Sequence, residues 1–291
     1  MTHTSGAGAA GHAPPAVIHI DLDGARHIYR THGWAYEADD DPLFESGMRG
    51  ALEVLAAAGV RATLFVITED LAAPARRALI DAAVAAGHEV GSHTITHRRL
   101  TTLDRSGKHR EIAGSRDQLE AAGFSVRGFR APSFGIDREC LELADAEGYR
   151  YDSSVLRTAT IPGLAAPAHR PSGPHRPFDD RRLLEWPVPV SDSWLPPFHP
   201  SYSLVLGEWL FRRGIRLAAR DGAPLVLLFH LTDFADPLPA GLARGWRKQL
   251  FTLSYQDGAR KRARCAAMLA FAAAHFRFTT TEDVLSRSLA S

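Results

Sequence analysis

The chain has 291 residues, of which 45% are hydrophobic, and its formal net charge at pH 7 is +1. This length and hydrophobic content are sufficient for one substantial core, while the nearly balanced charge and the lack of a basic stripe argue against nucleic acid as a partner. No run approaches the roughly eighteen apolar residues that a membrane-spanning helix requires, so no transmembrane segment is expected.

The first residues are rich in Ala, Gly, His and Pro, and we expect a disordered tail over residues 1–15 ahead of a single domain over residues 16–291. The tail has neither the positive start nor the apolar core of a signal peptide, which favours a cytoplasmic protein. Cys140 and Cys265 lie in Ala-rich or Leu-rich helical contexts. They are expected to be buried thiols rather than a disulfide or a metal pair.

Short apolar runs alternate along the chain with helical segments, most of which end at a glycine. The expected strands cover residues 17–20, 62–67, 88–90, 126–130, 149–152, 183–188, 225–230 and 277–279. The expected helices cover residues 46–58, 74–86, 108–122, 137–147, 204–220 and 258–275. This alternation predicts an α/β fold with a parallel sheet wound as a barrel. Residues 26–45 are expected to be a polar connection in which Asp39, Asp40 and Asp41 form a solvated turn before Pro42.

The first strand runs into two carboxylates at alternate positions, Asp21 and Asp23, with Leu22 between them. In an extended strand, alternate side chains point to the same side, so both carboxylates would face one way while Leu22 points into the apolar layer. The carboxyl ends of parallel strands are where α/β folds place ligand chemistry. Turn formation and helix capping are the alternative role for each aspartate, although one cap needs only one side chain.

A second motif places two histidines, His93 and His97, four residues apart after a break at Gly91 and Ser92. If the segment after Ser92 makes a helical turn, both imidazoles lie on one face and can converge on one divalent metal. In a chain with 14 histidines such a pair also arises by chance. The pair therefore indicates a metal site only if other motifs in the sequence point to the same site.

Two further strand ends carry polar side chains. Arg130 begins an Arg-Ala-Pro-Ser turn that ends at Ser133, and His230 ends the apolar run 225–230. A continuous apolar run of this kind is typical of a parallel strand that is buried on both faces. A single histidine in that position is often a core residue, but four strand ends that deliver Asp, His, Arg and His predict a site.

Together these motifs resemble those of the NodB-type polysaccharide deacetylases, carbohydrate esterase family 4. The resemblance covers about residues 16–285, and it is most specific at the His-x-x-x-His motif with its preceding Gly-Ser and at the Arg-x-Pro turn. It implies a distorted (β/α) barrel of about seven parallel strands and a metal-dependent hydrolase that removes an N-acetyl group from an amino sugar or a sugar conjugate. The chain departs from the family in its first motif, where the family has two adjacent aspartates and this sequence has Asp21-Leu22-Asp23.

The resemblance also implies how the metal is bound. Asp23, His93 and His97 are the expected ligands of one divalent ion, with Zn²⁺ the expected metal and an open position left for water. A metal in such a site lowers the pKa of water and polarises an amide carbonyl. The remaining histidines near the same edge, His27, His32 and His88, are not expected to be ligands because three suffice.

Five residues are assigned other roles by the same resemblance. Asp21 is the expected general base, and Arg130 is expected to pair with it and keep it ionised. His230 is expected to protonate the departing amine, and the backbone N–H of Ser133 is a candidate oxyanion donor. Trp186, at the end of an expected strand, is a candidate substrate contact because aromatic side chains commonly line such pockets.

Other functions remain open. The same catalyst would serve a deformylase of a formamido sugar or a hydrolase of a non-sugar amide. A carbohydrate-binding protein that has lost catalysis is a third reading, and the complete set of expected catalytic residues argues against it. The expected partner is a small-molecule or glycoside substrate, and the sequence does not predict an oligomeric state.

Overall fold

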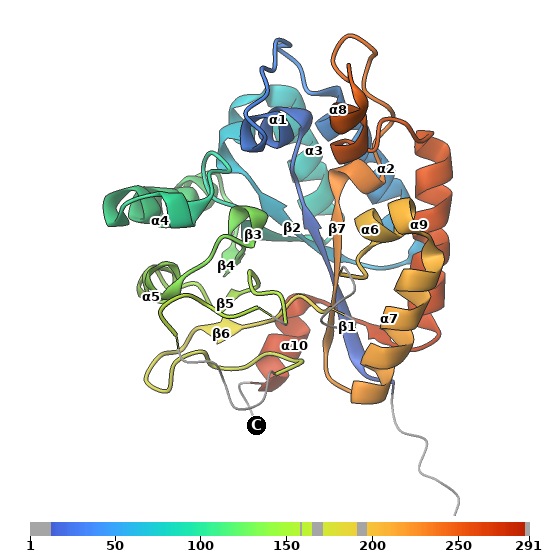
Figure 1. The fold of residues 1–291 in the computed structure, drawn as a ribbon. Helices are drawn as coiled ribbons and strands as arrows, with labels where there is room; N and C mark the ends of the chain where they lie inside the picture. Colours follow the sequence, from blue (N-terminus) through green and yellow to red (C-terminus); the bar gives the residue numbers. More distant parts are fainter. Residues whose placement is uncertain (1–12, 158, 165–170, 191–196, 289–291) are drawn as a thin grey trace, which may run out of the picture.

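The computed structural model describes residues 13–157, 159–164, 171–190 and 197–288 (Figure 1). The strands are β1 (Pro15–Asp21), β2 (Ala62–Val66), β3 (Glu89–Ser92), β4 (Val126–Phe129), β5 (Tyr151–Asp152), β6 (Leu184–Glu185), β7 (Leu225–His230) and β8 (Arg277–Phe278). The α-helices are α1 (Ala25–Thr31), α2 (Pro42–Ala58), α3 (Pro74–Ala85), α4 (Arg105–Ala121), α5 (Arg138–Ala146), α6 (Pro200–Leu206), α7 (Glu208–Asp221), α8 (Trp246–Phe251), α9 (Gly258–Ala273) and α10 (Thr281–Ser288). Four short 3₁₀ helices are η1 (Thr68–Ala72), η2 (Leu100–Thr102), η3 (Pro132–Phe134) and η4 (Leu231–Asp233).

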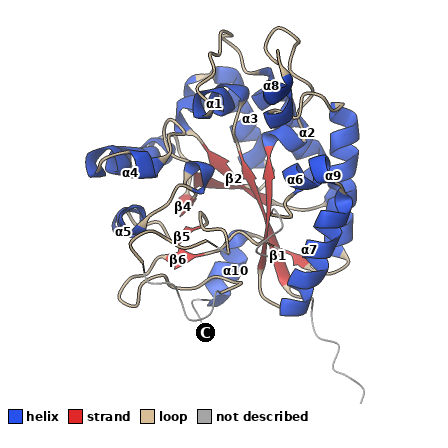
Figure 2. Ribbon diagram, in the orientation of Figure 1, coloured by secondary structure: helices blue, strands red, loops and turns tan. Residues whose placement is uncertain are grey.

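The strands form one parallel sheet in the order β6-β5-β4-β3-β2-β1-β7, with β8 paired to β1. Figure 2 shows this sheet curled into a barrel-like shape with helices around its outside. Among the described strands, no ladder joins β6 to β7. Near that gap the indole N–H of Trp186 donates to the carbonyl of Pro224 at 3.4 Å. The predicted distorted barrel of about seven parallel strands is confirmed.

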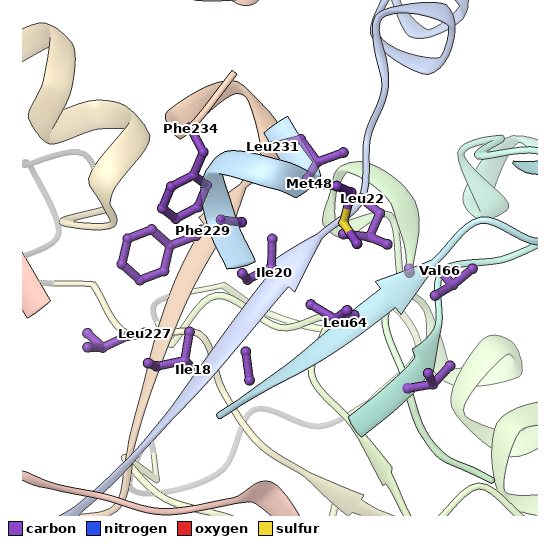
Figure 3. Close-up of a cluster of buried hydrophobic side chains, with 14 of the residues drawn as sticks. Ile18, Ile20, Leu22, Met48, Leu64, Val66, Leu227, Phe229, Leu231 and Phe234 are labelled. Atoms are coloured by element: carbon purple, nitrogen blue, oxygen red, sulfur yellow. The ribbon is translucent and has the colours of Figure 1, made fainter. Parts of the chain in front are cut away.

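Strand β1 pairs with β2 on one side and with β7 on the other, and its two faces have different surroundings. Ile18, Ile20 and Leu22 pack between the sheet and the outer helices (Figure 3). The alternate residues point to the other side, where Val17 joins a second apolar cluster inside the barrel. The backbone N–H of Leu22 donates to the carbonyl of Phe65 at 3.1 Å, so the extended pairing with β2 continues one residue past Asp21.

The connection after β1 differs from the prediction. Residues 26–45 contain helix α1, and Asp41 is buried rather than solvated. Its carboxylate accepts hydrogen bonds from the backbone N–H groups of Ala25, Arg26 and Phe44, so it caps α2 and holds the start of α1. A side chain at position 24 would collide with this carboxylate, and Gly24 avoids the collision.

Other helices and strands also differ from those expected from the sequence. The single helix expected over residues 204–220 is two helices, α6 and α7, because Gly207 has a φ of 110°. Helices α8 and α10 were not predicted. Pro15, expected in the tail, begins β1, and residues 1–12 of the expected tail lie outside the described residues.

The two cysteines are buried and free, as predicted. In the part of the chain that the structure describes, no helix combines the length and the apolar character needed to cross a membrane.

Candidate active site

A cavity of about 770 Å³ opens at the carboxyl ends of the central strands. Six of the expected catalytic and metal-binding residues line it, namely Asp21, Asp23, His93, His97, Ser133 and His230. Register explains part of this convergence, because Asp21 on β1 pairs directly with His230 on β7. The motifs that lie far apart in the sequence therefore meet at one edge of the sheet.

The three expected metal ligands lie together. One donor atom from each of Asp23, His93 and His97 lies within 4.8 Å of the other two. Nε2 of His93 is 3.2 Å from Oδ1 of Asp23, and Nε2 of His97 is 3.3 Å from Oδ2. Two ligand atoms about 2.0–2.2 Å from a tetrahedral ion are about 3.3–3.6 Å apart, so the spacing suits one metal.

The hydrogen bonding of this cluster fits a metal site. Oδ1 of Asp23 and Nε2 of His97 are buried and have no hydrogen-bond partner among the described residues. Unpaired polar atoms of this kind are costly unless a ligand satisfies them. Burial alone would raise the pKa of Asp23, but His97 and His93 hold that pKa well below its usual value. Asp23 is thus ionised, as a metal ligand must be.

Neighbouring groups orient both imidazole rings. Nδ1 of His93 lies 2.8 Å from the carbonyl oxygen of Arg130, which can only accept, so this nitrogen carries the proton. The hydroxyl of Thr31 donates its proton to the carbonyl of His27, so its oxygen accepts a hydrogen bond from Nδ1 of His97, 3.3 Å away. Each ring then directs the lone pair of Nε2 toward Asp23, the arrangement that metal-binding histidines commonly show.

The loop that carries the two histidines is not the helical turn considered from the sequence. Thr94 and His97 have φ angles of 69° and 57°, in the left-handed region that non-glycine residues rarely adopt. Glu111 on α4 holds this loop by accepting from the backbone N–H groups of Ile95 and Thr96 at 2.8 and 3.0 Å. The histidines converge because of these backbone angles, and such strain persists where the surrounding structure enforces it.

Asp21 lies between the ligand cluster and His230. Its Oδ1 is 3.1 Å from Nε of Arg130. Its Oδ2 is 3.9 Å from Nε2 of His93 and 3.8 Å from Nε2 of His230. Arg130 therefore balances the charge of one oxygen, while the other oxygen faces the groups that would hold a metal and a substrate.

The guanidinium of Arg130 is fully buried and is held by residues inside the barrel. Its Nη2 donates to Nδ1 of His19 at 2.6 Å and to the hydroxyl of Ser153 at 3.2 Å. Its Cζ lies 4.5 Å from the ring centre of Phe65. Because arginine only donates, Nδ1 of His19 must accept. Burial, followed by the charge of Arg130, holds the pKa of His19 well below its usual value, so this ring is neutral.

His230 ends β7 and presents its ring to the cavity. Its Nδ1 lies 3.0 Å from the hydroxyl of Ser201, and its backbone N–H donates to Asp233 at 2.9 Å. The other ring nitrogen, Nε2, lies 3.8 Å from Oδ2 of Asp21, and the ring lines the cavity. Ser201 was not predicted: it lies in the first turn of α6, ahead of the helix expected over residues 204–220, and the sequence gave no signal for it.

The remaining predictions for the site had different outcomes. Ser133 lines the cavity and has a φ of 53°, which places its peptide group at the cavity edge. The prediction for Trp186 was wrong: this side chain is 0% exposed and packs inside the barrel with Tyr151 and Leu184. An aromatic residue at a strand end can point to either face, and here it fills the barrel.

Several histidines serve structural contacts outside the ligand cluster. His27 is buried, with Nε2 2.9 Å from Glu69, and His88 accepts from the backbone N–H of Ala62. His32 lines the cavity and stacks on Trp34. His199 was missed: it also lines the cavity, and its ring centre is 5.4 Å from that of His230. Burial, then the neighbouring His230, holds the pKa of His199 well below its usual value.

A barrel whose strand ends bring together two histidines, two aspartates and an arginine has the groups that a metal-dependent hydrolase needs. The polysaccharide deacetylase family model matches residues 29–151. A chitooligosaccharide deacetylase of Sinorhizobium fredii (strain NBRC 101917 / NGR234) is 34% identical over 224 residues, which span 76% of this chain and 84% of that protein. The chain therefore belongs to the polysaccharide deacetylase family, and the prediction of a deacetylase is confirmed.

Solved structures share the fold. A polysaccharide deacetylase from Mycobacterium smegmatis superposes with a TM-score of 0.64 at 18% identity, over 99% of this chain and 95% of that chain. The Puue allantoinase has the same TM-score at 16% identity, over 97% of this chain and 93% of that chain. At these identities the two likenesses show the fold alone.

Proposed function

We propose that this deacetylase removes the N-acetyl group of an amino sugar with the help of one zinc ion held by Asp23, His93 and His97. The observation that carries the proposal is the close approach of these three ligands beside Asp21 and His230 in one cavity. The chitooligosaccharide deacetylase similar to this chain supports an N-acetylated sugar as the substrate. When bound, the metal would polarise the amide carbonyl and lower the pKa of water.

Asp21 is the proposed general base. Its Oδ2 is free of Arg130 and faces the cavity, so it can accept a proton from the water that attacks the amide carbon. The ion pair with Arg130, 3.1 Å from Oδ1, fixes the orientation of the carboxylate. The intervening Leu22 does not prevent this role, because its side chain is fully buried in the outer apolar layer and both aspartates point the other way.

His230 is the proposed acid. Its Nε2 faces the cavity from the strand next to Asp21, so a proton at this atom can pass to the departing nitrogen. Ser201 holds the opposite ring nitrogen and fixes the ring. The backbone N–H of Ser133 at the cavity edge is the proposed donor to the developing oxyanion, a role typically worth about 10² to 10³ in rate.

The test combines metal analysis with product analysis. The purified protein is expected to contain one zinc ion per chain and to release acetate, rather than formate, from N-acetylated and N-formylated forms of the same sugar. His230→Ala should cut acetate release by about 10² or more while the zinc content stays at one per chain. Release of formate alone would identify a deformylase, and loss of zinc in His230→Ala would make this residue a ligand.

A further inference from the structure

Exposed large hydrophobic side chains are concentrated on one part of the molecule. In the described ranges only Val84 lies elsewhere, and the other seven fall between residues 202 and 255: Tyr202, Val205, Leu206, Trp209, Trp246, Phe251 and Tyr255. Trp246 is 72% exposed, and Trp209 is 54% exposed. Single exposed hydrophobic residues are ordinary, whereas a concentration of this kind marks a binding surface.

This surface is continuous with the candidate active site. The cavity that contains the metal-ligand cluster is bounded on one side by an apolar wall, consisting of Tyr202, Val205, Leu206, Leu250, Phe251 and Leu253. The wall comes from α6 and from the end of α8, which both lie near the carboxyl end of β7 (Figure 1). A substrate bound at the metal would therefore have the apolar wall beside its non-reacting part.

The wall offers few hydrogen-bond partners to further sugar units, since the hydroxyl of Tyr202 is the one polar side-chain group among its six residues. Apart from Asp21 and Asp23, the cavity-lining side chains of the described residues include no carboxylate, amide, lysine or arginine. Sugars present many hydroxyl groups, which need hydrogen-bond partners when they leave water. Branched aliphatic side chains such as Val205 and Leu206 offer none. They do gain free energy by covering a hydrocarbon chain.

Basic residues lie beside the wall. Arg244 and Arg247 are exposed at the start of α8, and neither forms an ion pair with any residue that the structure describes. Lys248 lies 4.6 Å from the ring centre of Tyr29. A short helix that carries tryptophan, phenylalanine and basic residues is typical of surfaces that meet lipids, whose chains are commonly accompanied by anionic groups.

We propose that the substrate is amphiphilic: an N-acetylated amino sugar joined to a hydrocarbon chain, with the sugar at the metal site and the chain along the apolar wall. This inference rests on the proposed deacetylation. It goes beyond that reaction because it specifies what is attached to the sugar.

The experiment compares methyl and octyl glycosides of N-acetylglucosamine, both below the micelle-forming concentration, with acetate release as the readout. Each methylene that leaves water contributes up to about a fourfold gain. We expect kcat/KM to be about 100-fold higher for the octyl glycoside, the gain if half of its additional methylenes are covered. Equal rates for both glycosides would overturn the amphiphilic substrate and leave the deacetylation intact.

Binding by calorimetry separates the two proposals. If neither glycoside is hydrolysed and neither binds, both proposals fail. If the octyl glycoside alone binds without hydrolysis, the wall is a chain-binding site and the deacetylation is wrong. A sugar with an N-octanoyl group provides a further comparison: its preference over the N-acetyl sugar would place the acyl group on the wall and overturn the inference.

Variants of the apolar wall test whether it causes the preference for the octyl glycoside. Val205 and Leu206 are 42% and 48% exposed, so the double substitution Val205→Gln, Leu206→Gln should fold normally. It should lower the ratio of kcat/KM for the octyl glycoside to kcat/KM for the methyl glycoside by about tenfold or more. Val84→Gln is the matched control, since Val84 is 38% exposed on α3 and lies outside the cavity. An unchanged preference in the double variant would contradict the proposed position of the chain.

Discussion

The two sides of the cavity are built differently. The catalytic side is formed by strand ends, where Asp21, His93 and His97 are at most 5% exposed and are surrounded by hydrogen-bonding groups. The apolar wall is formed by two short helices, where Leu206 and Phe251 are about half exposed. The contrast teaches that the two sides have different roles. The backbone of the sheet sets the distances between the catalytic side chains, while the helices above it determine which substrate the cavity binds.

The largest effect is expected from loss of a metal ligand. His93→Ala removes one of three ligands from the catalytic side, and metal content and acetate release should both fall, the latter by about 10³ or more. The wall should be unaffected, so binding of the octyl chain should persist. His109→Ala is the control, because His109 is exposed on α4 and pairs only with Glu147. Full activity of His93→Ala would remove this residue from the metal site.

The next largest effect is expected at Asp21. Asp21→Asn keeps the shape of the side chain and removes the base, so the rate should fall by about 10² or more without release of metal. The measurement is kcat alongside metal content in the same preparation. Near-normal activity would favour another base and limit Asp21 to a structural role.

A smaller effect is expected from His19, which acts on Asp21 only through Arg130. His19→Leu removes the acceptor of the 2.6 Å hydrogen bond from Arg130, and kcat should fall by about tenfold while KM stays unchanged. His19→Asn can place an oxygen where Nδ1 lies and should restore part of kcat. A change in KM alone, or equal activity of the two variants, would contradict this positioning role.

The smallest effect on the catalytic side is expected at Glu111, which holds the histidine loop without contacting the ligand atoms. Glu111→Gln retains one acceptor oxygen and should lower metal affinity by about 10-fold, with little change in the rate of the metal-saturated enzyme. Competition with a chelator measures the affinity. An unchanged affinity would show that the backbone of Thr94 and His97 holds its conformation unaided.

The sequence was informative about the catalytic side and uninformative about the wall. Alternation along a strand was sufficient to place Asp21 and Asp23 on one side, because that geometry is local. The partners of Arg130 and His19 could not be read in this way: His19 and Arg130 are 111 residues apart, and His19 and Thr281 are 262 apart. Periodicity also carries no information about which face of the barrel receives a large aromatic residue, which is why Trp186 was misplaced.

The wall was missed for a different physical reason. Its residues lie on helices that are too short for periodicity to be recognised, six residues in α8 and seven in α6. The break at Gly207 depends on a φ of 110°, which a glycine allows but does not require. Only the folded chain shows that these two helices face the same cavity.

The most direct test of the central claim is reconstitution of the metal site. Acetate release from the N-acetylated octyl glycoside is measured with the protein as purified, after removal of metal by a chelator, and after titration with zinc. Activity should disappear with the metal and return in full at one zinc per chain, and His97→Ala should show no return. Undiminished activity of the metal-free protein would contradict the account.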